Sequence, residues 1–299
     1  MCGIFGYQVK KGEEVTPSEL TILGLTLADK MQFRGRDSFG GIFWPKESEG
    51  TILTVRGLGP VTENGPRFLQ ELSKAPKVLA HTRAATTGAV SVENTHPFEQ
   101  GDIVGVHNGI VYNHDALNRD YARDFNVDSQ HIFAHLDQNI DIEDLDAYGA
   151  VVWTKKSEHQ EKIYLGRSTS GSLTVARLFR NPNAASTDKN HTLIVFASTY
   201  EAIQLAAKRL GFQYHTVSNE TEKMYQIQDG EIYKTEKPFS LRTKIYTNSH
   251  SGVGYGYGHH SGWQHNNHSS VESARERVFQ GRHAEYQPTN NETRKQRKA

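Results

Sequence analysis

The 299 residues are enough for one large domain or two small ones, and the hydrophobic share of 36% indicates a modest core or a part that does not fold. Thirty-four lysine and arginine residues balance 34 aspartate and glutamate residues, so no overall charge attracts nucleic acid or a membrane. The single cysteine excludes an intrachain disulfide, and neither a secretory signal nor a long apolar run is present, so we expect a cytoplasmic protein without a membrane partner.

The first feature in chain order is a cysteine directly after the first methionine. Removal of Met1 would leave Cys2 with a free α-amino group and a thiol on one residue. These groups can act as base and nucleophile without a separate histidine. Their usual pKa values, about 7.7–8.0 and about 8.5, allow both to exchange a proton near neutrality. The alternative is that the position is accidental. Residues 3–9 are expected to form a strand that begins at Cys2.

Helical and strand patterns alternate through the first half of the chain. Thr16 and Pro17 indicate a helix start, and leucines at helical spacing predict a helix over 17–31. We expect a glycine-rich surface turn over 33–41. The other expected elements are strands at 41–45, 51–56, 77–80 and 103–106, and helices near 65–74, after Asp115 and from Asp128.

Polar segments follow two of these expected strands. His81–Gly88 comes after the strand at 77–80, and His107–His114 comes after the strand at 103–106. Such positions often build sites, because the strand fixes the residues while the loop leaves them accessible. The alternative for Asn108 and Gly109 is an ordinary hairpin turn, for which Asn-Gly is typical.

The second half changes to strand patterns and then to a low-complexity tail. Strands are expected at 148–153, 162–165, 173–176, 192–197 and 224–227, with one helix at 200–210 and a hairpin turn at Asp229–Gly230.

Composition divides the chain near residue 240. We expect a folded domain over 1–240 and a disordered tail over 241–299, rich in glycine, histidine and tyrosine. The tail carries nine lysine and arginine residues against four glutamates. It could hold an acidic partner or nucleic acid, or it could be a linker without a partner. Its histidines lack the framing of a zinc site, so no metal is expected.

Five motifs, taken together, resemble the class II glutamine amidotransferase domain, a member of the N-terminal nucleophile hydrolases. In the family's order they are Cys2–Gly6, Arg34–Gly40, His81–Thr86, Asn94–Pro97 and His107–His114. The resemblance covers about residues 1–238. It implies an α+β fold, a four-layer αββα sandwich of two antiparallel sheets between helix layers, without a cofactor.

The resemblance also implies a catalytic group. Cys2 would attack the side-chain amide of L-glutamine and form a thioester. Asn108 and Gly109 would form the oxyanion hole, through an amide side chain and a backbone N–H. Arg34 would support the nucleophile, holding its loop rather than touching substrate.

Four further residues match positions of the family that bind substrate. Arg83 would bind the α-carboxylate of glutamine with paired donors. Asp128 would bind the ammonium group, and its alternative role is a helix N-cap. Thr86 and His96 would shape the pocket. The sequence departs from the family at Ala84, where an aromatic residue is common.

The resemblance implies a partner as well. The chain shows no motif for an acceptor of ammonia, so we expect a free-standing glutaminase that supplies a partner synthase. Two alternatives remain: a hydrolase of the same superfamily for another amide, and a non-catalytic regulatory protein with the same fold. Arg83 and Asp128 argue against the first, and intact Cys2, Asn108 and Gly109 argue against the second.

Overall fold

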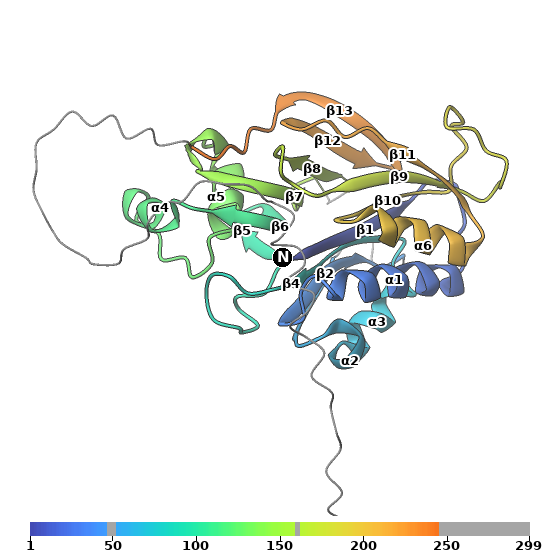
Figure 1. Cartoon of the computed structure of the whole chain (residues 1–299), viewed down its shortest axis with the longest axis horizontal. Coiled ribbons are helices and arrows are strands. Elements are labelled where there is room, and N and C mark those ends of the chain that lie inside the picture. Colours follow the sequence, from blue (N-terminus) through green and yellow to red (C-terminus); the bar gives the residue numbers. More distant parts are fainter. Residues whose placement is uncertain (47–51, 159–161, 245–299) are drawn as a thin grey trace, which may run out of the picture. The chain divides into compact units, whose positions relative to one another are not determined.

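The computed structural model describes residues 1–46, 52–158 and 162–244. Two antiparallel sheets lie face to face and carry helices on their outer sides (Figure 1). This confirms the expected α+β sandwich. The expected tail lies outside the described residues from 245 onward. No helix within the described ranges is long and apolar enough to cross a membrane.

Strand β1, which follows Cys2, is the middle strand of the larger sheet. It pairs with β10 on one side and with β4 on the other, antiparallel to both. In spatial order the seven strands of this sheet are β11 (Gln213–Val217), β9 (Thr174–Phe179), β10 (Leu193–Ala197), β1 (Gly3–Val9), β4 (Lys77–Arg83), β2 (Ser38–Trp44) and β3 (Leu53–Leu58).

The smaller sheet is built around the pair β6–β7. A hairpin joins its two last strands at Asp229 and Gly230, whose φ angles of 53° and 76° are those of the expected turn. In spatial order the six strands are β13 (Glu231–Pro238), β12 (Lys223–Gln228), β8 (Ile163–Arg167), β7 (Ala147–Lys155), β6 (Ile103–Val111) and β5 (Phe98–Gln100).

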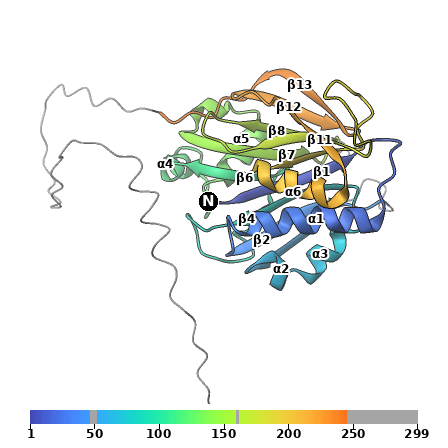
Figure 2. The same cartoon turned by 45° about the vertical axis from the view of Figure 1, so that its right-hand side comes forward.

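The helices form the two outer layers. The longest, α1, begins with a capping box in which Thr16 and Glu19 bind each other's backbone N–H groups. Helices α1 (Pro17–Gln32), α2 (Val61–Asn64), α3 (Pro66–Leu72) and α6 (Tyr200–Leu210) lie on the seven-stranded sheet, whereas α4 (His114–Asp120), α5 (Gln130–Gln138) and the 3₁₀ turn η1 (Ile142–Asp144) lie with the six-stranded sheet (Figures 1 and 2).

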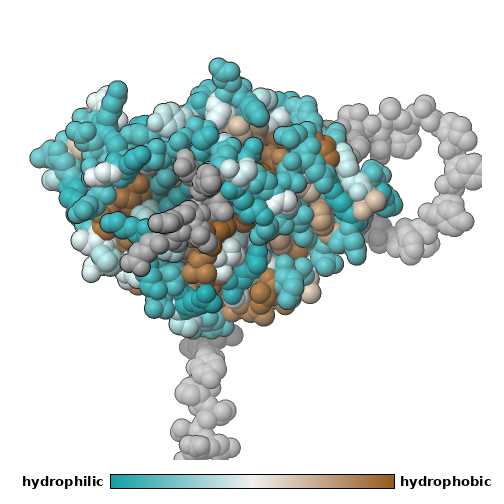
Figure 3. Space-filling view, turned by 180° about the vertical axis from the view of Figure 1, so that it is seen from behind, coloured by the Kyte–Doolittle hydropathy of each residue, from teal (hydrophilic) through white to brown (hydrophobic). Residues whose placement is uncertain are grey.

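Three hydrophobic cores separate the four layers. Because side chains alternate along a strand, Phe5 and Tyr7 of β1 face α1, whereas Ile4 faces the other sheet. In the same way Val104 of β6 faces the inter-sheet core, and Ile103 faces the core beside α5. The central strands of both sheets are therefore buried on both faces, while the outer surface seen in Figure 3 is mostly hydrophilic.

The structure corrects some expected boundaries. Strand β2 begins at Ser38, so half of the expected glycine-rich turn is strand. Strands β4 and β6 run on to Arg83 and Val111 and contain residues that were expected in loops. Strands β5 and β11 were not expected at all.

Candidate active site

Cys2 lies at the end of β1, where the two sheets face each other. The N-terminus lies between β4 and β6 in Figure 1 and beside both strands in Figure 2. Gly3, the next residue, pairs with Thr82 of β4. The strands whose ends carry the sequence motifs therefore meet around the cysteine.

The Cys2 thiol is held by the backbone of the residue that follows β4. The N–H of Ala84 points at Sγ over 3.4 Å, and Sγ lies 3.5 Å from the carbonyl oxygen of Ala84. Burial raises the pKa of the thiol, and the Ala84 N–H and the positive charge of Arg83 oppose that rise only in part. A thiol with a raised pKa is protonated at neutral pH, so it needs a base before it can attack.

Arg34 holds the backbone of the cysteine from the end of α1. Its Nε donates to the carbonyl oxygen of Cys2 over 2.7 Å. Gly35 packs so closely on the backbone of Arg83 that a Cβ there would lie 2.3 Å from it. Asp37 accepts from the N–H of Ala85 over 2.8 Å. This segment fixes both the nucleophile and the loop after β4.

Arg83, the last residue of β4, directs its guanidinium into the loop that follows. It donates to the carbonyl oxygens of Thr87 and Ala89. The positive charge of Arg83 acts to lower the pKa of the Cys2 thiol. The negative charges of Cys2 and Asp128 act in turn to raise the pKa of the Arg83 guanidinium, against the effect of its burial. The structure therefore brings these three sequence-predicted residues together.

Asn108 and Gly109 lie inside β6 and not in a hairpin turn. They pair with Ala150 and Gly149 of β7. A Cβ on Gly109 would lie 1.9 Å from the carbonyl oxygen of Tyr148, so only glycine fits at this position. The hairpin alternative is thereby excluded, and the amide of Asn108 is carried by a rigid strand.

Ser198 also belongs to this group, although no role was expected for it. It follows β10, is buried, and its Oγ accepts the N–H of Ile4 over 2.9 Å. The same Oγ lies 3.3 Å from Nδ2 of Asn108. One hydroxyl thus links the nucleophile strand to the expected oxyanion residue.

Asp128 does not cap the helix that follows it. The N-cap residue of α5 is Ser129. The carboxylate of Asp128 accepts instead from the backbone N–H of Val111 over 2.7 Å. Ser129 Oγ lies 2.9 Å from Nδ1 of His107, so the start of α5 is tied to β6 beside Asn108.

The two remaining sequence-predicted residues have different surroundings. Thr86 is exposed in the loop after β4. His96 is buried, with its ring centroid 4.2 Å from that of His81 and 4.4 Å from that of Phe98. Burial lowers the pKa of His96, so its imidazole is neutral. Any effect of His96 on a pocket therefore acts through its neighbours and not through a charge.

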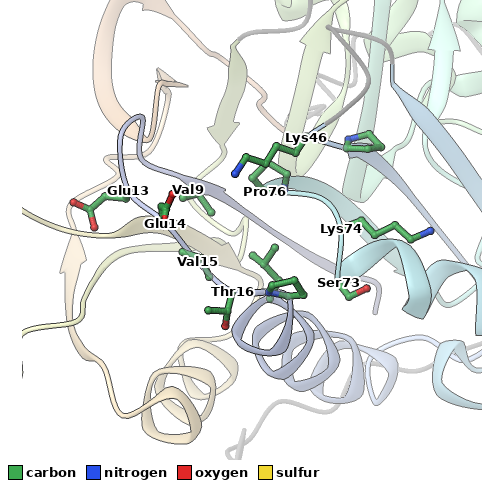
Figure 4. Close-up of a pocket in the computed structure, with 12 residues that line it drawn as sticks. Val9, Glu13, Glu14, Val15, Thr16, Lys46, Ser73, Lys74 and Pro76 are labelled. Atoms are coloured by element: carbon green, nitrogen blue, oxygen red, sulfur yellow. The ribbon is translucent and has the colours of Figure 1, made fainter.

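A pocket of about 590 Å³ lies at the other end of β1 and is not part of this site (Figure 4). It is lined by Val9, the last residue of β1, and by Thr16 at the start of α1. Val9 comes seven residues after Cys2 along this strand, a span of about 23 Å. Within the described residues, no group of histidine, cysteine and acidic side chains could hold a metal ion.

Comparison with known proteins shows which family the chain resembles over most of its length. The family model described as "Glutamine amidotransferases class-II" matches residues 1–234. Glutamine–fructose-6-phosphate aminotransferase (isomerizing) from Vibrio vulnificus is 34% identical over 141 residues, which cover 46% of this chain and 22% of that protein. The protein of the same name from Haemophilus influenzae is 33% identical over 194 residues, which cover 57% and 29%.

A solved structure supports the fold. Glutamine phosphoribosylpyrophosphate amidotransferase from B. subtilis, complexed with ADP and GMP, superposes with a TM-score of 0.54 at 21% identity. The superposition covers 81% of this chain and 50% of that one. The chain thus matches less than a third of the length of the two aminotransferases and half of this structure.

Proposed function

Because the chain belongs to the class II glutamine amidotransferases, we propose that it hydrolyses the side-chain amide of L-glutamine to glutamate and ammonia. The observation that carries this proposal is the position of Cys2. Its thiol lies against Ala84 at the end of β1, within reach of the charges of Arg83 and Asp128. A nucleophile and two charges of opposite sign suit a substrate that presents an amide, a carboxylate and an ammonium group.

The proposed reaction begins with removal of Met1. The free α-amine of Cys2 takes the proton of the buried thiol, and the sulfur attacks the amide carbon of glutamine. The carbonyl oxygen becomes an oxyanion, which Asn108 Nδ2 and the N–H of Gly109 stabilise. The amine then gives its proton to the departing nitrogen, and ammonia leaves. Water, deprotonated by the same amine, attacks the thioester and releases glutamate.

Arg83 and Asp128 select the free amino acid head of glutamine in this proposal. Arg83 has five N–H donors, and the carbonyl groups of Thr87 and Ala89 do not use all of them. A carboxylate can therefore join them. Asp128 accepts one N–H with one oxygen, which leaves its second oxygen for an ammonium group. Thr86 and His96 would shape the pocket around these contacts, and Arg34 would keep Cys2 in place.

We further propose that the ammonia passes to an acceptor site on a synthase domain or chain. The relatives that match are named as aminotransferases with a second substrate, and the family model already accounts for residues 1–234. Ammonia released into water is protonated and lost as a nucleophile, so transfer requires a docked acceptor. Work in the reducing cytoplasm would keep the Cys2 thiol free.

Purified protein tests the glutaminase proposal directly. Ammonia release should be measured from L-glutamine, from L-asparagine, and from glutaramide, which lacks the α-carboxylate and ammonium groups. We expect rapid release from glutamine alone, and intact mass without Met1. Faster turnover of glutaramide would support a hydrolase for another amide. No turnover by protein that lacks Met1 would support a non-catalytic role and overturn the proposal.

A further inference from the structure

We propose that Ser198 is a positioning residue that sets the oxyanion donor Asn108 against the nucleophile strand. This inference rests on the proposed glutaminase function. Ser198 belongs to the end of the seven-stranded sheet and Asn108 to the six-stranded sheet. Their hydrogen bond therefore crosses between the sheets beside Cys2.

Ser198 extends the pairing of β1 with β10. The regular register ends at Phe5 and Ala197. One residue farther, the backbone N–H of Ser198 donates to the carbonyl oxygen of Ile4 over 2.9 Å. The return bond comes from Ile4 N–H to Ser198 Oγ and not to a backbone carbonyl. The hydroxyl is thus fixed to the backbone two residues from the nucleophile.

Asn108 donates a hydrogen bond to the same oxygen. A hydroxyl oxygen has two lone pairs. Ile4 N–H takes one at 2.9 Å, and Nδ2 of Asn108 takes the other at 3.3 Å. The amide nitrogen carries two hydrogens, so one points at Ser198 and the other remains for the oxyanion. Ser198 thereby sets which hydrogen of Asn108 is free and where it points.

Among the contacts described above, no other hydrogen bond links the side-chain amide of Asn108 to strand β1. Strand β6 holds the backbone of Asn108 but leaves rotation about its side-chain bonds, and His81 ties only the backbone carbonyl of His107 to β4, over 3.1 Å. The Asn108 amide is fixed at its outer end by Ser198. A displacement of about 1 Å in a catalytic donor can cost 10²-fold in rate.

Four variants separate this role from a merely structural one. Ser198→Ala should lower kcat by roughly 10–100-fold with little change in KM, because the donor acts on the oxyanion and not on bound glutamine. Ser198→Thr and Ser198→Val have the same shape, and only the threonine keeps a hydroxyl. The threonine variant should retain most of kcat and the valine variant should not. Thr154→Val is the control, since it removes another buried hydroxyl, which is bonded to Lys162 O over 2.8 Å. Thr154 lies about 13 Å along β7 from Ala150, the residue opposite Asn108. This variant should leave kcat unchanged.

Two measurements show whether Ser198 acts through Asn108. In the Asn108→Ala background, Ser198→Ala should cost less than twofold more in kcat, because the group it positions is gone. The rate at which iodoacetamide alkylates Cys2, the single cysteine, should stay within twofold in Ser198→Ala, since alkylation forms no oxyanion.

Three outcomes would overturn the inference while wild-type protein hydrolyses glutamine. They are an unchanged kcat in Ser198→Ala, full additivity with Asn108→Ala, or alkylation that slows as much as turnover does. Should Ser198→Ala fail to fold by circular dichroism, equal kcat values in Ser198→Thr and Ser198→Val would overturn it. Wild-type protein without glutaminase activity would instead refute the proposed function.

Discussion

At the scale of single residues, the ionisation of Cys2 determines when the site can react. Burial raises the pKa of its thiol, so the thiol carries its proton at pH 7 and depends on the neutral form of the α-amine. The amine has a usual pKa of about 7.7–8.0. We expect kcat/KM to rise about tenfold per pH unit from pH 5.5 to about 7 and to level off above pH 8. Rates measured across this range test the assignment, and a rate that falls as pH rises through 7 would contradict it.

Substitutions of Cys2 are the control for this pH dependence of kcat/KM. Cys2→Ala should abolish turnover, and Cys2→Ser should leave little, because an alcohol is the poorer nucleophile. Both variants should bind glutamine as the wild type does, which isothermal titration can measure.

Arg83 and Asn108 should show opposite kinetic defects. Arg83→Ala should raise KM for glutamine by roughly 10–100-fold, since charge-assisted hydrogen bonds contribute about 1.5–3 kcal/mol each. Asn108→Ala should lower kcat by roughly 10²–10³ while KM changes little. Arg83→Lys is the matched variant, because it keeps the charge but loses the paired donors, and it should give an intermediate KM. Steady-state kinetics on the three variants measure this, and the same defect in all of them would refute the assigned roles.

At the scale of elements, the space between the two sheets near the site contains three buried imidazoles. Nε2 of His81 is hydrogen-bonded to the backbone carbonyl oxygen of His107, and the ring of His96 packs on that of His81. Burial lowers the pKa of His81 to about 3 and also lowers those of His96 and His107. The unfolded chain binds protons on these residues below about pH 6.5, whereas the folded chain does not. The free energy of unfolding should therefore fall as the pH falls below 6.5, by up to about 1.4 kcal/mol per pH unit for each histidine, and for His81 this fall should continue toward pH 3.

His96→Leu isolates one of these histidines. Both ring nitrogens of His96 are buried without a hydrogen-bond partner among the described residues, so an apolar side chain loses no bond there. Urea unfolding at pH 6.0 and 4.5 should show a slope smaller by about 1.4 kcal/mol per pH unit in the variant. At pH 7.5 all the imidazoles are neutral, and the difference in slope should vanish. Equal slopes at acid pH would show that His96 does not contribute.

The sequence predicted the bounds of elements in which apolar residues recur at a clear spacing. It predicted the bounds poorly for strands that are buried on both faces. Helix α1 and helix α6 were expected within a residue of their observed bounds, because apolar residues recur at helical spacing. Strand β2 begins earlier than expected because Gly40 and Gly41 lie under close neighbours, where a Cβ would meet other atoms at 2.1 Å and 2.9 Å. Glycines selected for close packing resemble glycines selected for turns, and sequence alone does not separate them.

The residues of the candidate site also differ in how far the sequence predicts them. Cys2, Arg83, Asn108 and Gly109 could be identified because they stand in motifs, and the structure brings the strands that carry them together. No role could be predicted for Ser198, since its hydrogen bonds join Ile4 and Asn108, which lie 194 and 90 residues away along the chain. The N-cap alternative for Asp128 was wrong because the carboxylate binds Val111 in a neighbouring strand, a contact that no local pattern predicts.

At the scale of the whole molecule, the packed unit continues beyond residue 240 before the description ends. Leu241 is buried, and the backbone of Arg242 pairs with Asp146 at the start of β7. Lys244 N–H donates to the carboxylate of Asp146 over 2.8 Å. We propose that the glutaminase site lies wholly within this unit. A chain cut after Lys244 should keep the wild-type kcat and KM for glutamine hydrolysis.

A second cut serves as the control for that prediction. Ending the chain after Pro238 removes Phe239 and Leu241, both buried among the side chains around α5, and should lower the unfolding temperature. Circular dichroism distinguishes a folded truncation from an unfolded one. A folded chain of 244 residues without glutaminase activity would show that residues 245–299 complete the site.

The long sequence separations within the site also determine when, during synthesis, the protein can begin to act. Strand β1 needs β10 as its neighbour, and Ser198 follows β10. Contacts between such distant segments form late, since the chain between them must first be made and closed into a loop. At about 5–20 residues per second, a ribosome takes roughly 10–40 s to pass from β1 to Ser198. If the proposed function holds, we expect a nascent chain to show no glutaminase activity during that interval, and a fragment released within it to release no ammonia.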